Sequence, residues 1–201
     1  MPTDLSYNSL EAVRSGLRDL LKIPARPTPS DHKTAAVLIL IYPGRKGLET
    51  ILTRRSGQLP NHAGQISFPG GRLEPDDANL VQTALREAHE EIGLDIRQVE
   101  VIGCLQSVHL PSKFHVTPVV GLMEQKPSLT PEPGEVEEIF SIPLAVVLDI
   151  GLYQQGSNIT NGIKKEFYYF DYNEYYIWGA TAYMLRSLAC FLSGARGLAD
   201  L

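Results

Sequence analysis

Cysteine is scarce in this chain, and its scarcity excludes two kinds of site. The two cysteines, Cys104 and Cys190, lie far apart in apolar sequence, without Cys-x-x-Cys or Cys/His spacing. Neither a zinc site nor a disulfide framework is therefore expected. We interpret both residues as ordinary buried thiols, the usual state of free cysteine.

Long apolar runs and excess positive charge are also missing. The longest apolar run, Ala35 to Tyr42, is less than half the length of a membrane-spanning helix. The start of the chain, MPTDLSYNSLEAV, has no basic stretch followed by an apolar block, so no secretory signal is expected. A net charge of −5 disfavours nucleic acid and membrane surfaces as partners. The simplest interpretation is a cytoplasmic protein.

The composition is typical of a globular protein. Apolar residues make up 43% and charged residues 20% of the 201 residues, enough for one domain with a sizeable core. Leucine and valine recur at helical spacing from about residue 5 to 22, and a segment rich in helix breakers, ARPTPSD, follows. We therefore expect an N-terminal helix and linker over residues 1–30 and the main domain over residues 31–201.

The main domain alternates strand and helix patterns. The expected elements are a strand hairpin at 36–55, a helix at 78–92, strands at 99–107 and 115–124, a strand and short helix at 135–148, aromatic strands at 164–172 and 174–178, and a largely buried helix at 180–196. This order favours an α/β fold in which helices cover both faces of a mixed sheet.

The helix at 78–92 concentrates negative charge on one face. At about 100° per residue, the apolar stripe consists of Val81, Leu85, Ala88 and Ile92, and the acidic face beside it consists of Glu87, Glu90 and Glu91. Like charges at this spacing disfavour an isolated helix by about 0.2–0.5 kcal/mol per pair, so an offsetting cation is expected. Arg86 can pair with Glu90, but one guanidinium does not neutralise three carboxylates. A magnesium ion, held by one or two carboxylates, waters and substrate phosphates, fits this pattern.

Turn residues flank the acidic helix on both sides. Before it, Gly70 and Gly71 allow the backbone to turn sharply and to approach a metal or a phosphate. Asp77 is expected to cap the first turn, and Gly93 is expected to end the helix in a left-handed conformation. Taken alone, an acidic cluster on a helix is most often solvated surface.

The surrounding motif points away from a solvated surface. Residues 86–94 read REAHEEIGL, which resembles at every specified position the R-E-U-x-E-E-x-G-U half of the Nudix signature, where U is apolar. The first half departs from the family pattern, because fourteen residues separate Gly71 from Arg86 and Ala78 stands where a glutamate is usual. Asp77 is the nearest substitute for that glutamate, as an auxiliary residue besides its expected role as a helix cap.

The resemblance implies the Nudix α/β/α sandwich and a metal-dependent hydrolase of nucleoside diphosphate derivatives, with Mg²⁺ or Mn²⁺ as cofactor. The implied metal ligands are Gly71, Glu87, Glu90 and Glu91, and the implied catalytic residues are Arg86, Glu87, Glu90, Glu91 and Glu135. Glu135 is chosen as the general base from four glutamates, the others being Glu132, Glu137 and Glu138.

A second motif resembles the branch of the Nudix superfamily that hydrolyses coenzyme A. It runs from Ile51 to Gly71 (ILTRRSGQLPNHAGQISFPGG), and Pro60 stands where that branch has arginine. The implied substrate-binding residues are Arg54, Arg55, Ser56, Gly64, Phe68, Gly70 and Gly71. The implied products are adenosine 3′,5′-bisphosphate and 4′-phosphopantetheine.

Two alternatives remain open. One is a hydrolase of ADP-ribose or another nucleoside diphosphate derivative, which Pro60 favours because arginine is the natural ligand of phosphate. The other is a regulatory module that binds a nucleotide without cleaving it. In each case the partner is a small nucleotide, and a homodimer is compatible with the resemblance.

Overall fold

The computed structural model describes residues 7–19, 33–45, 47–60, 62–110, 113–160 and 163–194. The helices are α1 (Leu10–Gly16), α2 (Leu80–Ile92), α3 (Leu144–Leu148) and α4 (Gly179–Leu192), with short 3₁₀ turns at Ile96–Gln98 and Ile150–Leu152. The strands are β1 (Lys33–Gly44), β2 (Gly47–Arg55), β3 (Ile66–Ser67), β4 (Gly70–Arg72), β5 (Glu100–Cys104), β6 (Val108–His109), β7 (Phe114–Leu122), β8 (Val136–Pro143), β9 (Gln154–Thr160), β10 (Ile163–Tyr172) and β11 (Tyr175–Trp178).

Eight strands form one sheet, and this sheet is mixed, as the sequence predicts. The main path is β3-β2-β1-β7-β5, while β4 pairs with β1, β6 with β7 and β8 with β2. The pair β1 and β7 is parallel, and the other pairs of this sheet are antiparallel. The β1–β2 hairpin forms as expected, with Ile41 opposite Thr50. The sequence of β1 is continuously apolar because this strand is buried on both faces of the sheet.

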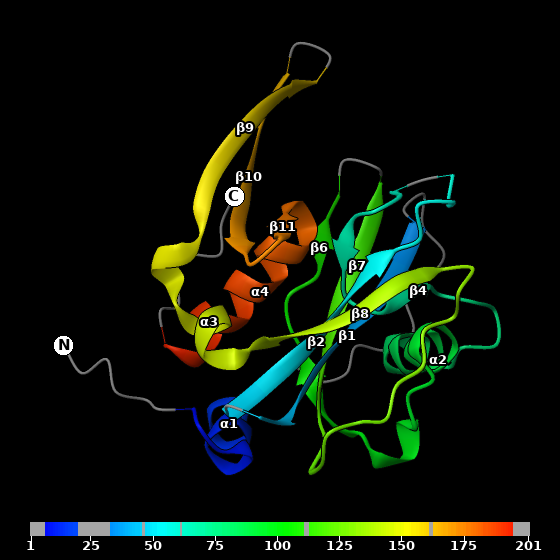
Figure 1. Cartoon of the computed structure of the whole chain (residues 1–201), viewed down its shortest axis with the longest axis vertical. Coiled ribbons are helices and arrows are strands. Elements are labelled where there is room, and N and C mark those ends of the chain that lie inside the picture. The colour runs from blue at the N-terminus through cyan, green and yellow to red at the C-terminus, as the bar shows by residue number, and fades with distance from the viewer. Residues whose placement is uncertain are drawn as a thin grey trace.

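Helices cover both faces of this sheet, which confirms the α/β/α sandwich (Figure 1). On one face, Leu80, Ala84 and Ala88 of α2 pack against β1 side chains such as Leu38 and Leu40. On the other face, α1, α3 and α4 share a second cluster with Ile39 and Ile41 of β1. The alternation of β1 side chains therefore divides the core into two layers.

A second sheet of three strands, β9-β10-β11, follows the main sheet in the chain. Tyr168, Phe170 and Ile177 point from it into the core cluster that contains α4. The paired strands β9 and β10 extend away from the body in Figure 1. The sequence did not predict β9, because its residues (QQGSNIT) are mostly polar and lack an alternating apolar pattern.

The N-terminal helix is shorter than predicted where the structure describes it. It spans Leu10–Gly16, and the side chain of Ser9 caps it by accepting a hydrogen bond from the N–H of Ala12. Val13 and Leu17 are fully buried against the core. The remaining predicted turns and the expected boundary at residue 30 lie partly or wholly outside the described residues, so the division into 1–30 and 31–201 stays a prediction.

Two expectations from composition can be compared with the structure. Cys104 and Cys190 are both buried free thiols, and burial raises the pKa of Cys104 to about 11. Within the described part of the chain, no helix has the length and apolar character that crossing a membrane requires.

Candidate active site

Helix α2 carries the acidic motif, and its ends follow from its sequence. Asn79 is the N-cap, because its side chain accepts a 3.0 Å hydrogen bond from the N–H of Gln82. Gly93 ends the helix with φ +66°, as predicted. In the predicted apolar stripe, Val81, Ala88 and Ile92 are buried and Leu85 is half-buried.

Asp77 does not cap the helix, which corrects the prediction. It lies two residues before the true cap, too early to reach the first-turn N–H groups. Its side chain is 2% exposed and accepts hydrogen bonds of 2.9 Å from the Glu74 N–H and the Thr83 hydroxyl. Burial acts to raise the pKa of Asp77, but hydrogen bonds from Arg86, Glu74 and Thr83 outweigh it and hold the pKa below its usual value.

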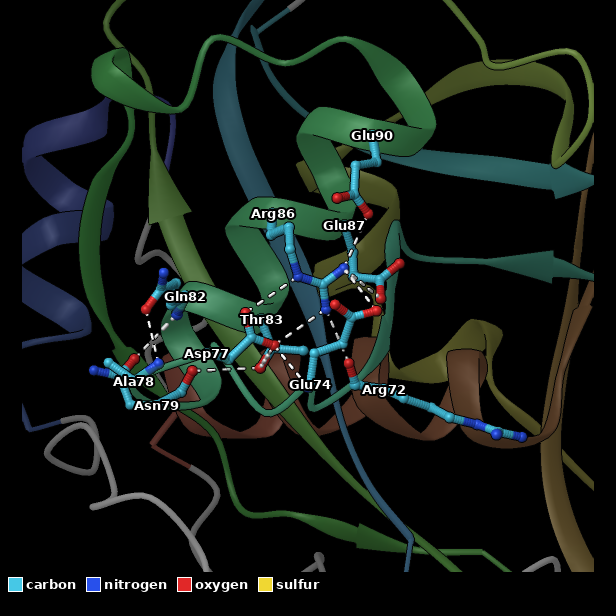
Figure 2. Close-up of polar contacts among 10 residues, drawn as sticks. All are labelled: Arg72, Glu74, Asp77, Ala78, Asn79, Gln82, Thr83, Arg86, Glu87 and Glu90. Carbon is cyan, nitrogen blue, oxygen red and sulfur yellow. Dashed lines mark hydrogen bonds and ion pairs between the residues drawn. The ribbon is translucent and has the colours of Figure 1, made fainter.

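Arg86 joins Asp77 to the acidic face (Figure 2). Its Nε and Nη2 donate to the two Asp77 oxygens, each at 3.1 Å, and Nη2 also donates to the Arg72 carbonyl. Its Nη1 donates to Glu87 at 3.0 Å and to Glu90 at 2.9 Å. These partners raise the pKa of Arg86 above its ordinary value, so the guanidinium is a fixed positive charge.

Glu91 is a buried carboxylate at the centre of the site. It is 4% exposed, and its Oε2 accepts a 3.0 Å hydrogen bond from the N–H of Gly70. Its Oε1 lies 3.7 Å from Nη1 of Arg55. Burial raises the pKa of Glu91 to about 7, and the charges of Glu87 and Glu135 add to the rise, while Gly70 and Arg55 oppose it.

Glu87 faces the same glycine pair from one turn earlier. Its side chain is 15% exposed, and a Cβ atom at Gly71 would lie 2.3 Å from its Oε1. Glycine at this position therefore makes room for the Glu87 carboxylate. Burial raises the pKa of Glu87, Arg86 lowers it, and the charges of Glu90 and Glu135 raise it further.

Gly70 is required for a different reason. Its φ is +156°, and a Cβ atom there would lie 2.4 Å from the Ala36 carbonyl oxygen and 2.6 Å from the Val37 Cα. Any side chain would push β4 away from β1, with which Gly70 and Gly71 are paired. The two glycines thus hold the turn against the sheet and expose it to Glu87 and Glu91.

The predicted cradle of three glutamates is not preformed. Glu90 is 55% exposed and pairs with Arg86, whereas Glu87 and Glu91 approach the glycine turn. Across the described ranges, no three Asp, Glu, His or Cys side chains already form a metal-binding group. The donor set still fits a hard divalent cation, because magnesium needs only one or two protein carboxylates when substrate phosphates supply other ligands. Burial raises the pKa values of Glu87 and Glu91, so a bound cation would favour the ionised form of both carboxylates.

The loop after β2 brings part of the second motif to this site. Ser56 is buried, its N–H donates a 2.8 Å hydrogen bond to the Glu135 carbonyl, and the N–H of exposed Gly64 donates to the Arg55 carbonyl. Phe68 is an exception, since it is 2% exposed within the hydrophobic core. The expectation that Phe68 binds substrate is therefore corrected: its aromatic ring packs the interior.

Arg54 and Arg55 point to opposite faces of the sheet. Arg55 reaches Glu91 on the α2 side, whereas Arg54 lies 3.3 Å from Glu138, with its guanidinium carbon 5.2 Å from the centre of the Tyr175 ring. Both arginine side chains are partly buried, at 31% exposed for Arg54 and 27% for Arg55. Sequence reasoning missed Tyr175 as a site neighbour, because only tertiary packing brings β11 to β2.

The sequence of this chain is similar to known proteins over most of its length. The NUDIX domain family matches residues 32–160. The uncharacterized Nudix hydrolase NudL of Photorhabdus laumondii is 37% identical over 166 residues, which cover 83% of this chain and 88% of the relative. That of Yersinia pestis is 40% identical over 158 residues, or 79% of each chain.

Solved structures show the same fold at lower identity. The Caenorhabditis elegans Ap4A hydrolase in a binary complex matches with a TM-score of 0.54 and 19% identity, over 80% of this chain and 98% of that one. A Nudix hydrolase of Mycobacterium smegmatis, RenU, matches with a TM-score of 0.50 and 24% identity, over 59% and 74%. The chain therefore belongs to the Nudix family, whose hydrolases cleave the pyrophosphate bond of nucleoside diphosphate derivatives.

Proposed function

We propose that this Nudix hydrolase cleaves coenzyme A or an acyl-CoA to adenosine 3′,5′-bisphosphate and 4′-phosphopantetheine, with Mg²⁺ or Mn²⁺ as cofactor. The observation that carries the proposal is the meeting of two motifs at one carboxylate. Glu91 of the signature helix accepts a hydrogen bond from Gly70 and faces Arg55 of the coenzyme A-like motif. The hydrolytic centre and the substrate motif therefore share one site.

Glu87 and Glu91 would hold the metal, together with the main chain of Gly71. Glu90 would join them after exchanging its ion pair with Arg86 for the cation. A divalent cation bound there would neutralise phosphate charge and lower the pKa of an attacking water. Arg86, fixed by Asp77, would keep the carboxylates oriented while substrate enters.

Glu135 is the proposed general base. It is exposed, and its charge acts on both Glu87 and Glu91, which supports a position beside the two carboxylates. Glu138, by contrast, is engaged by Arg54 and by the hydroxyl of Tyr175. A base needs an accessible carboxylate to take a proton from water. Glu135 meets that requirement better than Glu138.

Arg55 is the proposed ligand of the substrate diphosphate. Its Nε is buried and has no hydrogen-bond partner among the described residues, and its Nη1 is only loosely paired with Glu91 at 3.7 Å. A guanidinium with unused donors matches phosphate oxygens in geometry and charge. Ser56 and Gly64 would shape the loop around that phosphate, since their main-chain hydrogen bonds anchor both of its ends.

A substrate panel tests the proposal. Purified protein is incubated with coenzyme A, acetyl-CoA, ADP-ribose, NADH and diadenosine tetraphosphate, each with Mg²⁺ or Mn²⁺, and products are separated by chromatography. Release of adenosine 3′,5′-bisphosphate from coenzyme A at the highest kcat/KM supports the proposal. Cleavage of ADP-ribose with coenzyme A left intact would establish the second candidate, which Pro60 favours. Tight nucleotide binding without any cleavage would instead establish a regulatory module.

A further inference from the structure

The C-terminal part of the chain contacts the site from outside the matched family domain. That match ends at residue 160, whereas β10, β11 and α4 follow it. Tyr175, the first residue of β11, is 7% exposed and lies in the core cluster on the sheet face opposite α2. Arg54 points to this same face.

Tyr175, Glu138 and Arg54 form a closed set of contacts. The Tyr175 hydroxyl donates a 2.7 Å hydrogen bond to Oε1 of Glu138, and Oε2 of Glu138 lies 3.3 Å from Nη2 of Arg54. The Arg54 guanidinium carbon lies 5.2 Å from the centre of the Tyr175 ring. The same ring stacks on Phe140, with centres 3.6 Å apart and planes 1° apart. Tyr175 is thereby fixed in position, and it fixes Arg54 in turn.

Arg54 keeps unused capacity to bind an anion. Its side chain is 31% exposed, and in the described ranges its one ion pair uses Nη2 alone. The planar guanidinium can therefore still present other donors to phosphate oxygens. Because Arg55, the next residue, faces Glu91 on the other side of the sheet, an anion at Arg54 is separate from a diphosphate at Arg55.

We propose that Tyr175 is a positioning residue that orients Arg54, through Glu138 and ring contact, to bind a phosphomonoester on the substrate ribose. The assignment rests on the proposed function, since coenzyme A carries such a 3′-phosphate besides its diphosphate. It gives the β10–β11 hairpin a role in specificity, because this hairpin would select substrates that carry a second phosphate. It also supplies an arginine contact for an anion in a chain that has Pro60 in place of the arginine of the resembling branch.

Steady-state kinetics on coenzyme A and 3′-dephospho-coenzyme A test this assignment. Arg54→Gln should raise KM for coenzyme A about tenfold, leave KM for the dephospho compound within about twofold, and leave kcat near wild type for both. Tyr175→Phe should raise the ratio of KM for coenzyme A to KM for the dephospho compound by a smaller factor, because the ring remains. Tyr175→Leu should raise this ratio as much as Arg54→Gln does. Tyr176→Phe is the matched control, because Tyr176 is 48% exposed and contacts Tyr169 instead.

If Arg54→Gln raised KM equally for both substrates, or left the ratio of the two KM values unchanged, the assignment would be overturned and the proposed function would remain intact. Thermal unfolding identifies any variant that fails to fold. If the Tyr175 variants fail to fold, the ratio of KM values in Glu138→Gln and Arg54→Gln tests the assignment, because both of these positions are partly exposed.

Binding separates failure of the assignment from failure of the proposed function. If wild type cleaves no coenzyme A, the proposed function fails, and calorimetry with adenosine 3′,5′-bisphosphate and adenosine 5′-monophosphate tests Arg54 directly. Selective loss of affinity for the bisphosphate in Arg54→Gln and Tyr175→Phe supports the assignment. Equal affinity of wild type for the two nucleotides overturns it.

Discussion

The N–H of Gly70 donates a 3.0 Å hydrogen bond to Oε2 of Glu91, joining the glycine turn to the last turn of α2. The two residues lie 21 positions apart in the chain. The Glu91 carboxylate is only 4% exposed and lies near other negative charges, and this hydrogen bond stabilises its ionised form. The turn and the helix thus form a single unit, and a change on either side should alter both.

Replacing Glu90 with glutamine should remove activity while leaving the fold intact. Glu90 is 55% exposed, and a surface ion pair contributes less than about 1 kcal/mol, so the free energy of unfolding should change little. As a proposed metal ligand, however, it should be needed for turnover, with kcat/KM falling at least about a hundredfold. Urea denaturation and the coenzyme A assay measure the two effects.

Glu124→Gln is the matched control for Glu90→Gln. Glu124 is also exposed and paired with an arginine, Arg14, at 3.0 Å, but it lies outside the site. It should retain full activity. Wild-type turnover in Glu90→Gln would remove Glu90 from the proposed metal site.

The buried carboxylate of Glu91 should make stability depend on pH when metal is absent. Burial raises its pKa from 4.5 to about 7, so the folded state holds the proton more tightly than the unfolded state does. Below about pH 4.5 both states are protonated and Glu91 costs nothing. Between about pH 4.5 and 7 the free energy of unfolding should fall by up to about 3 kcal/mol as pH rises, and it should stay level above that range.

Denaturation of wild type and Glu91→Gln at pH 5 and pH 8, in EDTA, isolates this contribution. Glutamine keeps an oxygen for the Gly70 N–H but carries no charge, so the variant should gain on wild type at pH 8 and lose that gain at pH 5. The same difference at both pH values would show that Glu91 is not a strained buried acid.

Asp77 should contribute to both stability and catalysis, because it holds Arg86. Asp77→Asn removes a buried charge-assisted pair and should cost about 2–3 kcal/mol at neutral pH. Since the folded pKa of Asp77 is depressed, its stabilisation is present above its unfolded value of 3.8 and is lost as pH falls through the lower folded value. The deficit of the variant should therefore shrink in acid. Exposed Asp76→Asn is the neighbouring control, and an equal deficit in both variants would contradict this role.

The sequence predicted the elements whose pattern is local. The apolar run of β1, the stripe of α2 and the stop at Gly93 depend on spacing alone, and the structure confirms each. The strand β9 was missed because most of its residues are polar and it is held by pairing with β10. The sequence pattern within a strand does not indicate which other strand it pairs with.

The sequence predicted the site less completely than the fold. Asp77 looked like a helix cap, because its partner Arg86 is two turns away and its burial depends on the fold. Phe68 looked like a binding residue, because the motif around it is at the site while its ring points into the core. The contact of Tyr175 with Arg54 joins two strands that lie far apart in the chain, so no sequence spacing predicts it.

Glycine at position 71 should be required for activity more than for folding. In Gly71→Ala the new methyl group would lie 2.3 Å from Oε1 of Glu87, so that carboxylate must move. We expect kcat/KM to fall at least about tenfold, and the free energy of unfolding to fall by about 1 kcal/mol, because a half-buried side chain can shift. Gly151→Ala is the control, because Gly151 is exposed, lies outside the site and has only the Asp149 side chain, at 3.2 Å, near a Cβ there. Full activity in Gly71→Ala would show that the position of Glu87 does not matter.

The central claim is that Glu87 and Glu91 together hold a divalent cation against a substrate phosphate. Its most direct test is calorimetric titration of Mn²⁺ into the protein saturated with adenosine 3′,5′-bisphosphate, comparing wild type with the double variant Glu87→Gln/Glu91→Gln. Wild type should bind the ion, and the double variant should bind it at least about a hundredfold more weakly. Equal affinity in the two proteins would contradict the account.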